Sequence, residues 1–404
     1  MTLLVFLAAF FLAISGFLFD SYWVKVVSIP YPLIFLLLGV LIAGILLLVM
    51  RKSEKQSEPL LCVFFLFLIF MIISTASSFF SGAGDILALG MKSSTIVVNF
   101  LFFCSGYLLV NDKKGFFFAK SFFWLSLVLS ASFSLFLTEM FNPNWLGITL
   151  VFSVLILMLL EKRRKLIVFS LFFFGVSVFS YLILSSRGAA ISAFLAAVYL
   201  AFVRLNFRRL EYAINCFTII FLIFSTVFVS VFGVWLYNSK FYPYLVTLSI
   251  ENTGKSLDSS RLERWNLGAQ LFLDRPVFGW GIDSHIARAS DSDSYGDLHN
   301  FWWEVIFRGG LVGALCFMLI FSYIAYKVIK NNAGAEEVAA FLILFTFMSV
   351  YALGGVTHWP GAYMFWLTLG VVLGRSLSMR TTSRASDEST LTRIYGITDR
   401  FKGH

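Results

Sequence analysis

Residues Gly254 to Gly313 read GKSLDSSRLERWNLGAQLFLDRPVFGWGIDSHIARASDSDSYGDLHNFWWEVIFRGGLVG, and they form the one long polar stretch of a chain that is otherwise apolar nearly from end to end. Charged and titratable side chains gather in it beside the P-x-F-G-x-G sequence at 276–281; among them are Arg261, Arg264, Arg275, Arg288, His285 and His299. Ionisable groups are costly inside lipid and mark functional sites in membrane proteins. This stretch is therefore the first candidate for a functional site.

The rest of the chain has the composition of a membrane protein. Hydrophobic residues make up 59% and charged residues 13% of its 404 positions, whereas soluble domains carry about a quarter charged residues. Long apolar runs recur, each able to cross the ~30 Å hydrocarbon core as a helix, and strand patterns are absent. We therefore predict an all-α, polytopic membrane protein with about twelve transmembrane helices, at 3–19, 30–50, 59–79, 92–110, 116–138, 145–160, 166–185, 188–203, 211–236, 301–326, 338–356 and 361–374.

Basic residues predict how these helices are oriented. They concentrate in alternate connecting loops, and loops rich in Lys and Arg stay in the cytoplasm. The net charge of +9 is thus an orientation signal and does not indicate nucleic acid as a partner. Both termini are then cytoplasmic, and the long loop at 237–300 faces outward. The basic clusters are Arg51/Lys52/Lys55, Lys113/Lys114, Lys162–Lys165, Arg204/Arg208/Arg209, Lys327/Lys330 and the tail from Arg375.

The spans divide the chain into three parts. Residues 1–138 are predicted to be N-terminal transmembrane helices, and residues 139–378 a transmembrane core that includes the 237–300 loop. Residues 379–404 have no apolar pattern and are expected to be a disordered cytoplasmic tail. The four cysteines lie in apolar runs at spacings that fit neither a disulfide framework nor a metal site, which predicts packing roles for Cys62, Cys104, Cys216 and Cys316.

Within the loop, Ser259-Ser260 can cap an amphipathic helix that runs through Asp274. Arg261, Arg264 and Gly268 follow the i, i+3, i+7 spacing and share one face of this helix. The small residue on that face is expected to let a bulky lipid headgroup approach.

Glycines are expected to shape the chain after this helix. Pro276 ends the helix, and Gly279 and Gly281 permit a tight turn of the backbone. Gly309-Gly310 and Gly313 would let the helix that follows the loop pack closely on a neighbour.

His299 stands where the loop re-enters the membrane, and two explanations fit it. It could cap the next helix, or it could exchange protons near neutral pH at the position of a substrate headgroup. The triplet Asp291-Ser292-Asp293 is interpreted as part of a mobile loop and not as a metal site. His285 and His358 match no motif and are expected to be structural.

Three residues upstream also have more than one explanation each. Lys92 could be an interfacial lysine or a phosphate contact. Asn144 could simply cap the helix after Pro143, or it could contact sugar or pyrophosphate. Arg187 carries a charge among apolar neighbours, so it makes a structural ion pair, extends to the membrane interface or binds an anion.

Several of these residues form an ordered set of motifs. The motifs are S-R-x-x-R-W from Ser260, R-P-x-F-G-x-G from Arg275, and His299-Asn300 followed after nine residues by G-x-x-G from Gly310. In this order they resemble the domain shared by bacterial O-antigen ligases and O-antigen polymerases, over roughly residues 140–320. Weaker matches lie at Asn142–Asn144 and Ser186–Ala189.

The resemblance implies a membrane glycosyltransferase that needs neither metal nor cofactor. Such enzymes take a glycan from undecaprenyl pyrophosphate on the periplasmic side of the bacterial inner membrane and move it to a sugar hydroxyl. The implied partners are this lipid-linked donor, an acceptor that is lipid A-core or a growing glycan, and membrane lipids. A diphosphate is already a good leaving group, so no metal is expected.

The resemblance also implies roles for individual residues. Arg187 and Arg264 would bind the diphosphate with Arg261 as a helper, because guanidinium groups match phosphate oxygens bidentately. His299 would act on the acceptor hydroxyl as its base or orienting group. Lys92 is a further candidate for a phosphate contact from its own position, and supporting roles are expected for Asn300, Gly279, Gly281 and Asn144.

Ligation of a finished polysaccharide onto lipid A-core is favoured over polymerisation of repeat units. Ala314-Leu315 follow Gly313, where ligases often carry two threonines, and this departure keeps the polymerase open. A pilin-glycosylating relative is a further alternative. A transporter is less favoured because the spans contain no convincing two-fold repeat.

Overall fold

The structure is a computed structural model that describes residues 54–80, 86–110, 113–136, 143–161, 166–183, 187–206, 227–228, 230–253, 261–282, 298, 300–330, 337–338, 340–341, 343–344 and 364–377. This part of the chain is helical and contains no strand, which confirms the all-α prediction for the described residues. Its labelled helices are α4 (Glu54–Phe80), α5 (Ile86–Leu109), α6 (Lys113–Phe136), α7 (Pro143–Leu160), α8 (Leu166–Leu182), α9 (Arg187–Asn206), α11 (Phe241–Thr253), α12 (Arg261–Asp274) and α14 (Phe301–Lys330).

Two stretches in the described part are long and apolar enough to cross a membrane unaided, Glu58–Phe80 and Phe301–Lys330. Shorter apolar helices accompany them, among them Leu146–Leu160, Ile167–Leu182 and Met364–Leu377. The predicted spans at 3–19 and 30–50 lie outside the described residues, as do most of 211–236 and 338–356 and the tail at 379–404.

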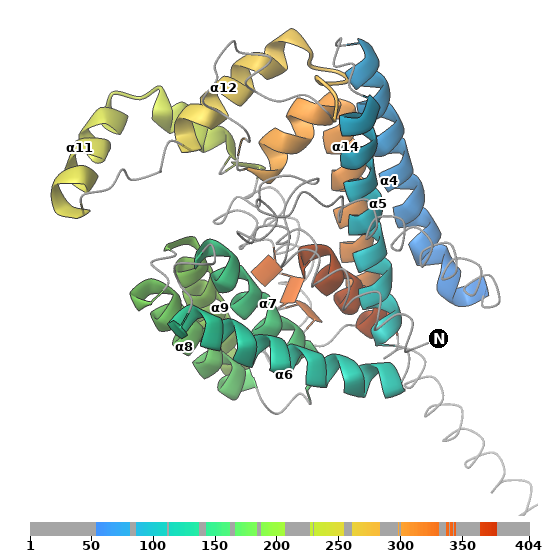
Figure 1. Ribbon diagram of the computed structural model, residues 1–404, viewed down its shortest axis with the longest axis vertical. Helices are drawn as coiled ribbons and strands as arrows, with labels where there is room; N and C mark the ends of the chain where they lie inside the picture. The colour runs from blue at the N-terminus through green and yellow to red at the C-terminus, as the bar shows by residue number, and fades with distance from the viewer. Residues whose placement is uncertain are drawn as a thin grey trace, which may run out of the picture.

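One group of helices consists of α4, α5 and α14, which stand side by side in Figure 1 with the helix Met364–Leu377 next to them. Aromatic side chains fill the space between these helices. Phe67 of α4 meets Phe317 of α14 at a ring distance of 5.7 Å and Trp366 at 4.8 Å. Such edge-to-face pairs add to the stabilisation that burial of the rings already gives.

Glycines bring α5 and Met364–Leu377 into backbone contact. A Cβ atom on Gly370 would lie 2.9 Å from the backbone nitrogen of Tyr107, and one on Gly374 would lie 2.6 Å from its carbonyl oxygen. Small residues let membrane helices approach this closely.

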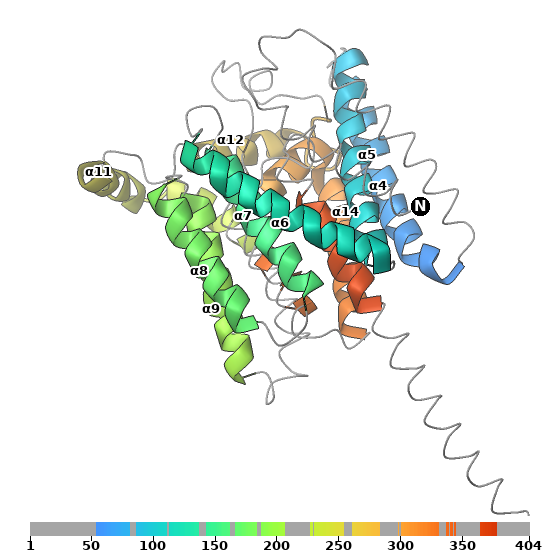
Figure 2. The ribbon, with the colours of Figure 1, turned by 60° about the horizontal axis from the view of Figure 1, so that its bottom comes forward.

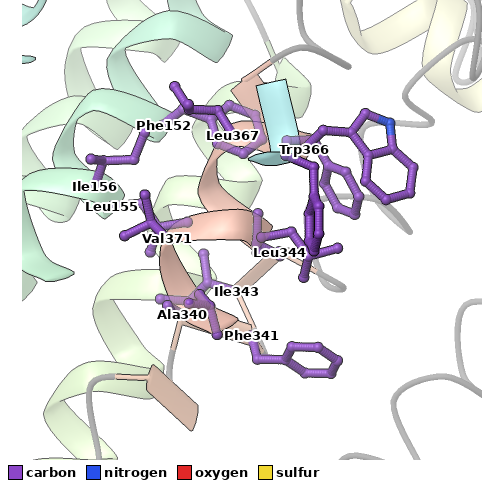
Figure 3. Close-up of a cluster of buried hydrophobic side chains, with 14 of the residues drawn as sticks. Phe152, Leu155, Ile156, Ala340, Phe341, Ile343, Leu344, Trp366, Leu367 and Val371 are labelled. Carbon is purple, nitrogen blue, oxygen red and sulfur yellow. The ribbon is translucent and has the colours of Figure 1, made fainter. Parts of the chain in front are cut away.

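The second group is formed by α6, α7, α8 and α9, which lie together in both ribbon views (Figures 1 and 2). Ser177 and Ser170 of α8 donate hydrogen bonds of 2.8 Å to the carbonyls of Ala190 and Ala197 of α9, respectively, so these helices form an antiparallel pair. The buried helix α7 joins the two groups: Phe152 and Leu155 lie beside Leu367 and Val371 (Figure 3).

Three ion pairs connect residues that the basic loops assign to the cytoplasmic side. They are Lys120–Glu161 at 2.5 Å, Lys327–Glu58 at 3.2 Å and Arg375–Glu337 at 2.5 Å. These contacts are expected if the loops concerned share one side of a membrane. Ser77, nineteen residues from Glu58 along α4, bonds the turn that follows α12. That separation is about 28 Å of helix, close to the hydrocarbon thickness.

Two helices begin at other residues than the sequence predicted. The prediction that Asn144 caps α7 is wrong, because α7 already begins at Pro143 and Asn144 lies in its first turn. Proline is favoured at the first helical position, where its missing N–H removes no hydrogen bond. Lys92 does not open its helix either, since α5 begins at Ile86.

Candidate functional site

The helix α12 (Arg261–Asp274) ends at Asp274, as the sequence predicted. It buries Leu262, Trp265 and Leu271 against Leu298, just before α14, and Trp303 in the first turn of α14. An i, i+3 spacing of apolar residues directs one face of a helix into the protein. α12 is thereby fixed on the first turns of α14, and Figure 1 shows the two helices adjacent at one end of the molecule.

The two arginines of α12 lie toward this packed side. Arg261 and Arg264 are both half-buried, and the Nε atom of Arg264 is inaccessible to solvent. The expectation that Gly268 opens this face to a lipid headgroup is wrong, because a Cβ atom there would lie 2.8 Å from the Leu298 side chain. Gly268 instead makes room for Leu298.

The turn after α12 has the tight backbone path that its glycines predicted. Gly279 has φ 70° and Gly281 has φ 99°, a region that glycine adopts without steric cost. The carbonyl oxygen of Gly279 accepts a hydrogen bond of 2.6 Å from the Ser77 hydroxyl, and the Ile282 N–H donates to the Ser74 carbonyl at 3.0 Å. The turn therefore rests on the end of α4.

This turn also exchanges hydrogen bonds with a break in α14. At Gly310 the backbone has φ 61° and ψ −158°, which no helix allows. The carbonyls of Phe307 and Arg308 accept bonds from the N–H groups of Trp280 (2.7 Å) and Gly281 (3.0 Å). In return, the N–H groups at 311 and 312 donate to the carbonyls at 276 and 277, at 2.9 and 3.2 Å.

The exchange explains how a broken helix persists in an apolar setting. Four backbone groups that an unbroken α14 would pair internally are all paired with the turn. Irregular backbone at membrane depth is tolerated only when such groups find other partners. Gly309 and Gly313 have the packing role that the sequence predicted, since a Cβ atom on either would lie within 3 Å of the Phe70 ring.

Asn300 caps α14. Its Oδ1 atom accepts bonds from the N–H groups of Trp302 at 3.0 Å and Trp303 at 3.1 Å, as an N-cap side chain does. Its Nδ2 atom donates to the Ser230 hydroxyl at 3.0 Å. The capping role that was one explanation for His299 is therefore filled by its neighbour.

Arg275 of the R-P-x-F-G-x-G motif lies over an aromatic ring. Its Cζ atom is 4.5 Å from the centre of the Trp280 ring, a cation–π contact. The Trp280 Nε1 atom donates to the Leu271 carbonyl at 2.8 Å, which holds the ring against the end of α12.

A buried ion pair lies in the part of α14 that precedes the break at Gly310. The Nε atom of Arg308 is 2.9 Å from Oε2 of Glu304, and the two side chains are 2% and 1% exposed. The second carboxylate oxygen of Glu304 accepts a 2.8 Å bond from the Leu298 N–H. Arg308 also donates to the Ile282 carbonyl.

Sequence reasoning missed this pair, although the sequence contained a signal for it. Two opposite charges four residues apart inside a predicted transmembrane span are costly unless they pair, so their presence indicates a partner or a function. The motifs that point to the site end at the edge of this span, and the pair lies within it.

The described structure brings Arg261, Arg264, Gly279, Gly281 and Asn300 to one end of the molecule. His299 lies outside the described residues, between Leu298 and Asn300, which both are described. The Asp291-Ser292-Asp293 triplet, His285 and His358 lie outside them as well.

The remaining predicted residues belong to described helices, but their side chains are outside the description: Arg187 is the first residue of α9, Lys92 belongs to α5 and Asn144 to α7. Within the described residues, no group of three or more His, Cys, Asp or Glu side chains could hold a metal.

Comparison with known proteins bears on the same segment. No curated protein matches the chain. Residues 172–318 match the family model described as O-Antigen ligase. The match begins in α8 and ends in α14, so it includes α12, the turn, the break at Gly310 and the His299-Asn300 pair. Residues 172–318 of this chain are therefore a domain of the O-antigen ligase and O-antigen polymerase family.

Proposed function

We propose that the protein is a ligase of the bacterial inner membrane. It moves a polysaccharide from undecaprenyl pyrophosphate to a sugar hydroxyl of lipid A-core during lipopolysaccharide biosynthesis. The observation that carries the proposal is that α12, the glycine turn and the start of α14 pack as one unit within the matched segment.

Arginines supply the donor chemistry in this proposal. Arg264 and Arg261 lie together on α12 in partly buried positions, where exclusion of water strengthens charge-assisted bonds to phosphate. With Arg187, and with Lys92 as a further contact, they bind the diphosphate. They also stabilise the charge that develops on it as it departs.

His299 acts on the acceptor. In the transfer step a bond forms between the acceptor oxygen and the anomeric carbon of the donor sugar, while the bond from that carbon to the diphosphate oxygen breaks. The diphosphate leaves with the electron pair, and the hydroxyl proton passes to the imidazole of His299. Asn300 and the glycine turn support the site by fixing the backbone around it.

The site faces the periplasm in this proposal, and both termini are cytoplasmic. Two observations support this orientation. Basic loops alternate along the chain, and the Lys327–Glu58 ion pair lies at the opposite end of α4 from Ser77, which bonds the glycine turn. About twelve transmembrane helices would make up the complete chain.

Polymerisation of repeat units is the second candidate, and a specific observation favours it. Ala314-Leu315 follow Gly313 where ligases often have two threonines. Both reactions use the same donor and the same site, so they differ only in the acceptor.

The test is the lipopolysaccharide banding pattern of a deletion strain. For a ligase, long chains disappear from lipopolysaccharide while polymer accumulates on undecaprenyl pyrophosphate. A pattern of core plus a single repeat unit would identify the polymerase. Unchanged lipopolysaccharide and unchanged lipid-linked glycan would exclude both.

A further inference from the structure

The loop that precedes His299 leaves the described structure at Ile282 and returns to it at Leu298. Both residues are fully buried. Each is bound by one member of the buried ion pair: the Ile282 carbonyl accepts from Arg308, and the Leu298 N–H donates to Glu304. The two charged side chains lie one helical turn apart on α14 and bond each other at 2.9 Å.

Each carboxylate oxygen of Glu304 accepts one hydrogen bond from a neighbouring group. Oε1 binds the backbone of Leu298, and Oε2 binds Arg308. A buried ion pair seldom stabilises a fold more than apolar side chains of equal volume would. What the pair supplies here is a fixed position for the chain just before His299.

On the other side of His299 the backbone is fixed as well. Asn300 caps α14 through its Oδ1 atom and bonds Ser230 through its Nδ2 atom. The carbonyl of Asn300 accepts a 2.9 Å bond from the Glu304 N–H. Glu304 therefore contacts the residues on both sides of His299, through its side chain and through its own N–H.

We propose that Glu304 is a positioning residue for His299, and Arg308 compensates the charge of its buried carboxylate. The inference rests on the proposed function, in which His299 accepts the proton of the acceptor hydroxyl. A displacement of about 1 Å in a reacting group can slow a reaction by about 10²-fold. Loss of the Glu304 contact is therefore expected to lower kcat and to leave donor binding unchanged.

Two double variants isolate this contact. Glu304→Gln/Arg308→Met and Glu304→Leu/Arg308→Met both remove the ion pair, so neither leaves a buried charge uncompensated. The first keeps an amide oxygen that can accept the Leu298 N–H, and the second does not. Glu337→Leu/Arg375→Met is the matched control, because it removes another ion pair with a buried carboxylate in the described part of the chain, between residues assigned to the opposite side of the membrane.

Purified proteins are compared for kcat, for KM of the lipid-linked donor and for deuterium exchange at the Leu298 amide, below the unfolding midpoint of every variant. We expect kcat of the Glu304→Leu/Arg308→Met variant to fall about 10²-fold, with donor KM unchanged and faster exchange at Leu298. The Gln variant and the control should stay within a few-fold of wild type in kcat.

Equal kcat values in the Gln and Leu double variants would overturn the inference, as would equal exchange at Leu298. The exchange measurement needs no activity. If the wild type transfers no glycan, the proposed function fails, while exchange at Leu298 still decides whether Glu304 holds this backbone.

Discussion

Gly310 is the residue on which the shape of the site depends. Its φ of 61° and ψ of −158° fall in a backbone region that is essentially restricted to glycine. A Cβ atom there would also collide with the carbonyl of Val277, the group that accepts the bond from residue 312. The break in α14 and the turn at 276–281 therefore depend on each other.

Replacement of Gly310 by Ala should destabilise the protein by about 3 kcal/mol or more, because backbone strain and a steric clash add together. Thermal unfolding in detergent measures this. Gly175→Ala in α8 is the matched control, since a Cβ atom there meets nothing within 4 Å. An equal unfolding midpoint for the two variants would contradict the structural role given to Gly310.

Substitutions of Arg264 can separate the effect of its positive charge on transfer from the effect of its guanidinium shape. Arg264→Ala should abolish transfer, and Arg264→Lys should keep only a small part, since an ammonium group cannot reproduce a bidentate guanidinium contact. Transfer by purified protein is the measurement, with Gln270→Ala on the exposed side of α12 as the control for handling and folding. Full activity of the Ala variant would remove Arg264 from the site, and Arg187 can be tested in the same way.

At the scale of the elements, local patterns predicted the helices well and their breaks poorly. The amphipathic pattern and Pro276 were sufficient to place the end of α12 at Asp274. The span at 301–326 was predicted as one helix, but α14 runs to Lys330 and is broken at Gly310. The break requires hydrogen-bond partners at 276–281, about thirty residues away, and no local pattern reports such partners.

The candidate site was predictable only in part for the same reason. The motifs found Arg264, Gly279 and Gly281, because their order along the chain carries the signal. The roles of Gly268 and Glu304 depend on Leu298, which reaches them only when α12 folds onto α14. Asn300 was predicted as a supporting residue; its side chain caps α14, and its part in the site stays a prediction.

Contact between α5 and the helix Met364–Leu377 leads to a prediction about packing. Gly370→Leu should lower stability by about 1–3 kcal/mol or more, because the added side chain would overlap the backbone of α5 at Phe103 and Tyr107. The thermal unfolding midpoint measures the loss. Gly175→Leu, at a position with open space, should leave the midpoint nearly unchanged, and a similar fall in both variants would argue against specific packing at Gly370.

For the whole molecule, the prediction concerns orientation. If the 237–300 loop is periplasmic, Ser292→Cys in a variant without the four native cysteines should react with a membrane-impermeant maleimide in intact cells whose outer membrane admits the reagent. Ser53→Cys in the first basic loop is the control and should react only after the inner membrane is opened. The reverse pattern would invert the topology.

We propose that one site, formed where α12 packs on the broken α14, carries out glycan transfer through His299. Because Asn300 already caps α14, replacing His299 by Asn tests its chemistry with the helix cap left in place. The measurement is transfer from undecaprenyl-pyrophosphate glycan to lipid A-core by purified wild-type and His299→Asn proteins, with donor binding and thermal stability recorded for both. We expect the wild type to form product. The variant should bind the donor equally well, unfold at the same temperature and transfer roughly 10²–10⁴-fold more slowly. A stable His299→Asn protein that transfers glycan at the wild-type rate would contradict it.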